Sequence, residues 1–243
     1  SSCAQRGDRF AILNTVAPSA NASQDFQAFR TQTQGSNLSY GAVYYPWLSL
    51  SSGQSVPPAG AVAGLMAKTD RQKGVWKAPA NVQIQGIAGP THALSNGEQQ
   101  IAQVHSSGKS INPFIQMTGR GSVIWGSRTL AGNDNEWRYV PVRRFLMMVE
   151  QSVEKGLNWA VFEPNNANTW AQIEALCEAY LDDLWRQGAM QGSRAEKAYY
   201  VRCGQGVTMT ANDVQQGRMI IEIGMATVRP AEFVVMKIVL QNR

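Results

Sequence analysis

The chain has 243 residues, 44% of them hydrophobic, which is enough to bury the core of a large folded domain. Only 16% are charged, and the 22 basic residues behind the net charge of +5 are scattered along the sequence, which argues against a dedicated nucleic-acid binder. The composition instead predicts a polar, weakly charged surface of the kind that suits a subunit buried among neighbours.

The cysteines and the termini limit the class of protein further. Cys3, Cys177 and Cys203 are odd in number and widely spaced, so they predict neither a disulfide framework nor a zinc cluster. No apolar run approaches the roughly 20 residues that cross a bilayer, and the N-terminus lacks a signal-peptide pattern. We therefore expect a protein made in a reducing cytoplasm without membrane insertion. Because the first eight residues run into an apolar strand without a linker, and the chain has no initiator methionine, we also expect a fragment or a processed product.

The first third of the chain alternates strands and helices. Residues 9–13 predict a short apolar strand, residues 25–30 a short helix, and residues 40–50 a strand rich in aromatic side chains. Pro57 and Pro58 then precede a helix of small residues at 59–69. The small side chains predict that this helix packs closely against its neighbours.

The middle of the chain predicts one helix, a hairpin and a second helix. Residues 96–106 predict a helix with Asn96 as its N-cap, and strands at 113–117 and 122–125 flank a glycine turn. Apolar residues at helical spacing predict a helix over 140–153. Residues 159–162, Trp-Ala-Val-Phe, predict a short buried strand.

The last third predicts one long helix and three strands. The helix covers 169–187, with Asn168 as its cap and Gly188 as its stop. The strands are expected at 198–203, 219–226 and 232–240. Overall, the order of elements predicts an α/β or α+β fold, a mixed β-sheet flanked by helices, within one domain at 1–243. The C-terminal strands would complete that sheet or extend to a neighbour.

Catalytic and metal-binding patterns are weak. His92 and His105 are the only histidines, and neither lies at a metal-ligand spacing from the other or from a cysteine. The turn at 119–122 places its serine too late for a nucleophile elbow, and the glycines at 86–89 fall short of a dinucleotide fingerprint. The sequence therefore predicts no catalytic residue, no cofactor and no metal site.

Nine segments in collinear order resemble the C-terminal half of contractile phage tail sheath proteins, and of their relatives in contractile bacteriocins and injection systems. Residues 123–130 are similar to the family's Trp-Gly-Ala-Arg-Thr-Leu segment, with Ser127 in place of alanine. Asn14 stands where the family usually has aspartate, and from the resemblance we expect the chain to lack the N-terminal arm of complete sheath subunits. The nine segments are residues 8–13, 42–48, 56–64, 69–81, 121–130, 137–144, 161–165, 188–192 and 228–234.

The resemblance implies a structural subunit that polymerises helically around an inner tube and contracts to drive the tube through a target envelope. Its partners would be other sheath subunits, the tail tube protein and the baseplate, with no nucleic acid and no cofactor. Its place would be a virion tail assembled in the host cytoplasm. The alternatives are a static tail or capsid module, or an α/β enzyme with an unrecognised site.

In this family, terminal arms add strands to a neighbour's sheet, which is a form of β-augmentation. Residues 231–243 are the candidate linker strand here, although the same residues could form an ordinary strand of the domain's own sheet. Charged positions that could contact neighbours, or simply face solvent, lie elsewhere in the chain. The predicted partner-binding residues are Arg229, Phe233, Val235, Lys237 and Val239 near the C-terminus, and Lys68, Arg71 and Arg143.

Overall fold

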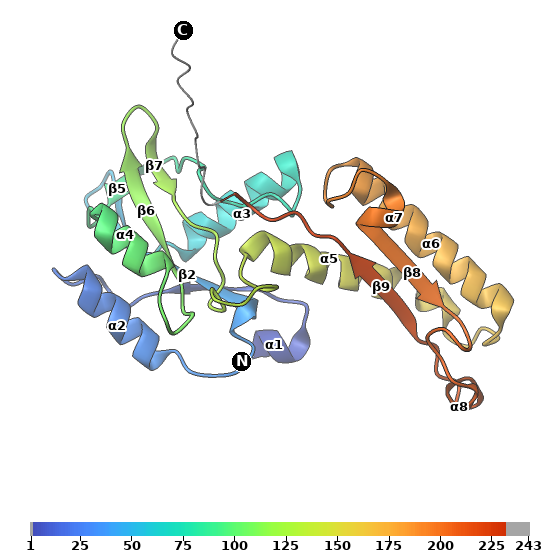
Figure 1. The fold of residues 1–243 in the computed structure, drawn as a ribbon. Coiled ribbons are helices and arrows are strands. Elements are labelled where there is room, and N and C mark those ends of the chain that lie inside the picture. The colour runs from blue at the N-terminus through green and yellow to red at the C-terminus, as the bar shows by residue number, and fades with distance from the viewer. Residues whose placement is uncertain (1, 232–243) are drawn as a thin grey trace, which may run out of the picture.

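The computed structural model describes residues 2–231, and its larger part is built on a four-stranded sheet in the order β1-β2-β6-β7 (Figure 1). β1 (Ala11–Asn14), β2 (Gly41–Tyr45) and β6 (Ile111–Met117) run parallel, and β7 (Gly121–Ile124) returns antiparallel to β6. The strands β6 and β7, with the glycine turn between them, form the predicted hairpin. The expected fold class, a mixed sheet flanked by helices, is confirmed.

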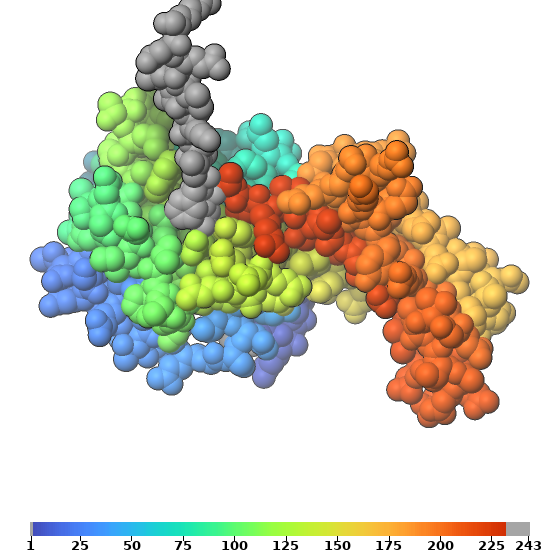
Figure 2. All heavy atoms as spheres, viewed as in Figure 1, coloured from blue at the N-terminus to red at the C-terminus, as the bar shows by residue number. Residues whose placement is uncertain are grey.

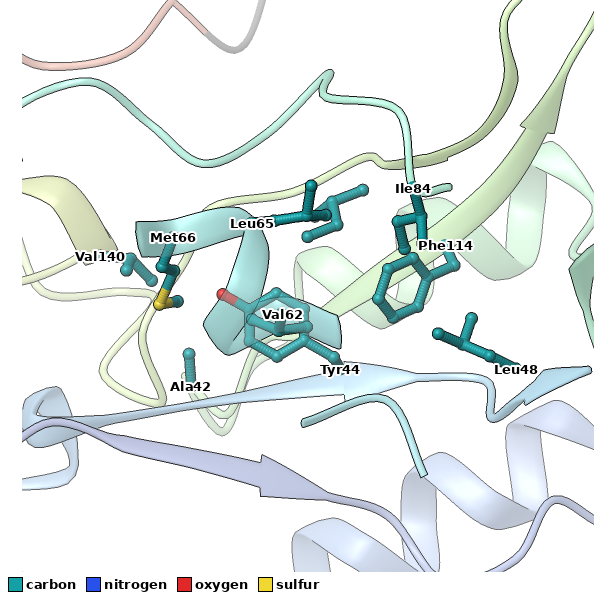
Figure 3. Close-up of a cluster of buried hydrophobic side chains, with 10 residues drawn as sticks. Ala42, Tyr44, Leu48, Val62, Leu65, Met66, Ile84, Phe114 and Val140 are labelled. Atoms are coloured by element: carbon teal, nitrogen blue, oxygen red, sulfur yellow. The ribbon is translucent and has the colours of Figure 1, made fainter. Parts of the chain in front are cut away.

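The central strand β2 is buried along its whole length, because helices cover both faces of this sheet. On one face α3 (Ala59–Lys73) packs its apolar side chains against Tyr44 of β2 (Figure 3). On the other face α2 (Ala22–Gln32) and α4 (Asn96–Gln103) cover Val43 and Tyr45. Since successive residues of a strand point to opposite faces, β2 contributes to both cores.

Smaller elements complete this part of the molecule. They include a three-stranded sheet in the order β4-β3-β5, which continues beyond the end of β2. The elements are α1 (Ser2–Arg6), η1 (Leu38–Tyr40), β3 (Leu48–Leu50), β4 (Ser55–Val56) and β5 (Ile87–Pro90).

A second lobe follows β7, and it has its own apolar cluster. The long helices α5 (Val140–Gly156) and α6 (Ala167–Arg186) carry a two-stranded antiparallel ribbon made of β8 (Tyr199–Cys203) and β9 (Ile221–Met225) (Figure 1). The remaining elements of this lobe are η2 (Asn158–Ala160), α7 (Ala195–Ala198) and α8 (Ala211–Gln215).

Trp76 helps to join the two lobes. It follows α3 in the sequence, yet its ring meets that of Phe145 on α5 edge to face, with 6.1 Å between the centroids. The half-buried pair of Asp70 on α3 and Arg144 on α5 connects the same two helices. The ribbon is therefore attached to the sheet lobe through α5.

The structure corrects two predicted helix caps and one predicted sheet. Ser95, rather than Asn96, caps α4: its hydroxyl accepts the Glu98 N–H, and the Glu98 carboxylate accepts the Ser95 N–H. Asn166, rather than Asn168, caps α6. The strands β8 and β9 pair with each other and do not complete the main sheet. The third predicted C-terminal strand, at 232–240, lies outside the described residues.

The prediction of a buried strand at 159–162 is wrong. Trp159 lies in the single turn η2 (158–160). The two side chains that follow this turn are exposed, Val161 by 60% and Phe162 by 102%. The Glu163 N–H donates to the Ala160 carbonyl and closes the turn that follows η2. A run of four apolar residues carries no periodicity that could separate a buried strand from an exposed turn.

Cysteine reactivity offers a test of the second lobe. Burial raises the pKa of the Cys203 thiol to about 11 and also raises the pKa of Cys177, whereas Cys3 is half-buried on α1. We expect a thiol reagent at pH 8 to modify Cys3 alone in the folded chain, and all three cysteines in guanidinium, because only the thiolate reacts. Mass spectrometry of the labelled chain would show this. Modification of Cys203 at the rate of Cys3 would contradict the packing of β8 on α6.

Candidate subunit interface

The β8–β9 ribbon has backbone groups along its outer edges that its own strand pairing does not use. Its register pairs Tyr199 with Met225 and Cys203 with Ile221, and just beyond this pairing the Ala226 N–H donates to the carbonyl of Ala198, at 2.8 Å. Hydrogen-bonded pairs alternate along an antiparallel ribbon. The backbone N–H and C=O groups that point away from the ribbon therefore belong to residues 199, 201 and 203 on β8 and to residues 221, 223 and 225 on β9.

The two outer edges differ in what lies beside them. On β8, the Cys203 N–H is taken by the Glu174 carboxylate of α6 at 2.7 Å, so this edge is partly satisfied by its own helix. Within residues 2–231, no strand pairs with the outer edge of β9. An isolated pair of strands is marginally stable, and an unpaired edge is a template for another strand.

The ribbon has one apolar and one polar face. Ile221, Ile223 and Met225 belong to the cluster over α5 and α6, and all three stay only partly buried. On the opposite face, the Tyr200 hydroxyl donates to the Glu222 carboxylate at 2.7 Å, which raises the pKa of that hydroxyl. A strand added beside β9 would cover more of the apolar face, because the sheet would extend over the two helices.

The absence of a side chain at Gly224 makes room for the Tyr200 ring. A Cβ atom at Gly224 would lie 2.1 Å from the nearest ring atom of Tyr200, the residue directly opposite on β8. The Tyr200 ring therefore lies flat across the ribbon, and the Arg202 guanidinium stacks over it at 4.8 Å from the ring centroid.

The predicted C-terminal partner residues are only partly described. Arg229 is exposed and follows β9, after Thr227 has bridged to Met190. The role of Arg229 as a partner-binding residue stays a prediction. The other members of this group, Phe233, Val235, Lys237 and Val239, lie outside the described residues.

The predicted charged contacts fall into two kinds. Lys68 and Arg71 are exposed on α3, three residues apart, and they remain candidates for partner contacts. Arg143 is not a surface charge: it is 6% exposed, with its guanidinium 3.5 Å from the Tyr40 ring centroid and 4.2 Å from that of Trp137. Burial lowers its pKa. Arg143 is thus a packing residue of its own chain.

The structure of residues 2–231 also bears on metal binding and on membrane insertion. This part of the chain contains no group of three or more histidine, cysteine, aspartate or glutamate side chains that could hold a metal ion. None of its helices combines the length and the apolar character needed to cross a membrane.

Two protein-family models match the chain and together account for nearly all of it. Residues 2–130 match the phage tail sheath protein central domain, and residues 132–241 match the phage tail sheath C-terminal domain. The chain belongs to the phage tail sheath family. The two matches meet between β7 and α5, and the single domain expected over 1–243 stays a prediction. Membership of this family indicates a structural role.

An individual sheath protein shows the same likeness. A prophage major tail sheath protein of Pseudomonas aeruginosa (strain UCBPP-PA14) is 28% identical over 189 residues, which is 76% of this chain and 46% of that protein. The chain therefore spans about half the length of this relative.

Two solved assemblies contain chains of the same fold. The sheath complex of the extracellular contractile injection system PVC, in its contracted state, matches with a TM-score of 0.86 and 37% identity, over 95% of this chain and 63% of that one. The baseplate of the anti-feeding prophage matches with a TM-score of 0.81 and 40% identity, over 96% and 60%. The fold described above is thus that of contractile sheath proteins.

Proposed function

We propose that this chain is the part of a contractile sheath subunit that holds neighbouring subunits together through its β8–β9 ribbon. The observation that carries the proposal is the bare outer edge of β9, whose Ile221, Ile223 and Met225 are left half-buried. A strand from a neighbour would satisfy their outward N–H and C=O groups and extend the apolar face over α5 and α6. The family to which the chain belongs supports this use of the ribbon.

In the assembled sheath, subunits wind helically around a tail tube, and contraction drives that tube through a target envelope. Backbone hydrogen bonds between strands hold partners at fixed register, while the linkers that lead to the strands allow the subunits to rotate. The tail tube and the baseplate are the other proposed partners. The location follows as the tail of a virion or of an injection system.

The exposed cations of α3 are proposed to make weaker contacts between subunits. Lys68 and Arg71 form no ion pair within residues 2–231, so they are free to face a neighbour's carboxylates. Exposed ion pairs contribute only about 0–1 kcal/mol each. Such contacts can therefore change partners during contraction, while the strand pairing persists.

The donated strand is proposed to come from residues 231–243, whose sequence predicts a strand. Deleting these residues is expected to abolish tubes or rings of the sheath subunit that carries this chain, because the β9 edge of each neighbour would stay bare. Negative-stain electron microscopy of the purified subunit measures this directly. Replacing the same residues by a glycine-serine segment of equal length is the matched control, and it should fail to assemble as well. Normal assembly after the deletion would refute the donated strand.

A further inference from the structure

The outer edge of β8 is largely closed by hydrogen bonds inside its own lobe. Its outward N–H groups are those of Tyr199, Val201 and Cys203. The Tyr199 N–H donates to the carbonyl of Ala195 and closes α7, while the Cys203 N–H donates to the Glu174 carboxylate at 2.7 Å. Among the described residues, only the Val201 N–H of this edge is left without an acceptor.

The outer edge of β9 is open by comparison. In the part of the chain that the structure describes, the outward N–H groups of Ile221, Ile223 and Met225 have no acceptor. The orange-red atoms of β9 lie on the face of the molecule that is turned to the viewer (Figure 2). The two edges of one ribbon therefore differ in how readily they accept a further strand.

A carboxylate from a neighbouring helix occupies the position that a strand added beside β8 would need. Glu174 comes from α6, the helix on which β8 packs, and its side chain is half-buried. An incoming strand would have to place a backbone carbonyl oxygen at the Cys203 N–H, where the Glu174 oxygen already lies. A charged acceptor forms a shorter and stronger hydrogen bond than a neutral carbonyl, so the incoming strand competes poorly.

The charge of Glu174 opposes a second strand in another way as well. A carboxylate repels the partly negative oxygen of any carbonyl brought beside it, and this repulsion is strongest where water is partly excluded. Inward-pointing charged side chains are one way in which proteins protect the edges of their sheets from unwanted pairing. The position of Glu174 at the end of β8 fits this use.

We propose that Glu174 confines strand addition to the β9 edge of the ribbon. The inference rests on the proposed function, in which residues 231–243 of a neighbour pair with β9. A ribbon open at both edges would accept a strand on its wrong side, or pair edge to edge with the ribbon of another copy. Either event would join subunits outside the helical order, because a regular helix needs the same contact between every pair of neighbours. Glu174 is thus a specificity-determining residue, and it does not itself bind the donated strand.

Counting bound strands tests this role. The experiment uses the subunit that carries this chain, ended after Pro230 so that its own segment cannot compete, and a synthetic peptide with the sequence of residues 231–243. Native mass spectrometry is expected to show one peptide on the wild-type subunit and two on Glu174→Ala. Glu174→Gln is the matched control, because its amide oxygen still accepts the Cys203 N–H, and it should bind one. Glu178→Ala removes an exposed carboxylate one turn further along α6 and should also bind one.

Hydrogen exchange supplies a second measurement that needs no substitution at Glu174. Adding the peptide to the wild-type subunit should slow the amide exchange of Ile223 at least about tenfold, because that N–H gains an acceptor. The amide of Val201, the free outward N–H of β8, should keep the exchange rate that it has without peptide. Equal slowing at Val201 and Ile223 would overturn the inference, even if Glu174→Ala failed to fold.

The outcomes separate this inference from the proposed function. If Glu174→Ala keeps the circular dichroism of the wild type and still binds one peptide, the role of Glu174 is wrong and the proposed function stands. Two peptides on the wild-type subunit would also overturn the inference. The absence of peptide from the wild type and from every variant would overturn both proposals, because no strand would then be added to the ribbon at all.

Discussion

Replacing Asn112 by alanine is expected to lower the free energy of unfolding by about 3–5 kcal/mol, since each buried partner left unsatisfied costs about 1–3 kcal/mol. Asn112 lies on β6 and is completely buried. Its amide donates to the carbonyls of Val43 and Arg128, at 3.1 and 2.8 Å, and its side-chain oxygen accepts the Arg128 N–H at 2.8 Å. The side chain thus joins the central strand β2 to the segment that follows β7, and the backbone groups that it would leave behind are buried.

Urea unfolding followed by tryptophan fluorescence would measure this loss. Asn133→Ala is the matched control, because Asn133 also donates to two backbone carbonyls, those of His105 and Ser106, but does so at the surface. Water can replace those bonds, so the control should cost about 1 kcal/mol or less. Equal losses in the two variants would mean that Asn112 is not the buried connection described here.

Replacing Ile223 by proline is expected to abolish sheath assembly while the chain still folds. The N–H of Ile223 points away from β8, so proline removes a donor that the ribbon itself does not use. A strand added at the β9 edge would lose that hydrogen bond and would meet the proline ring. Electron microscopy reports assembly, and circular dichroism reports the fold.

Two neighbouring changes make this prediction specific. Ile223→Ala keeps the N–H and should assemble, although less stably, because a half-buried apolar side chain is shortened. Gly224→Pro removes an N–H that points toward Tyr200 of β8, and should disturb the ribbon itself. If Ile223→Pro assembles as well as Ile223→Ala, the β9 edge takes no part in the assembly.

The sequence predicted the regular elements well where periodicity was long. The helices expected at 140–153 and 169–187 are present as α5 and α6, and the hairpin of β6 and β7 lies where its glycine turn indicated. Helix ends were less certain, because several cap-forming residues stand together before α4 and before α6. Only the backbone geometry shows that Ser95 and Asn166 supply the caps.

The candidate interface was harder to predict than the fold. The strands of the ribbon were expected at 198–203 and 219–226, but strand pairing, and with it the open edge of β9, is a tertiary property that a sequence pattern does not carry. Tertiary packing also explains why the burial of Arg143 was missed, because one of its two aromatic partners, Tyr40, lies about a hundred residues earlier in the chain. A basic residue beside another basic residue on a helix resembles a solvated pair, although here one side chain is buried and only the other reaches Asp70.

A density map of the assembled particles tests the central claim most directly. Cryo-electron microscopy of tubes built from the subunit that carries this chain is predicted to show a strand from a neighbouring subunit hydrogen-bonded to residues 221, 223 and 225 of β9. Tubes in which this edge stays bare, or a subunit that remains strictly monomeric under assembly conditions, would contradict the account.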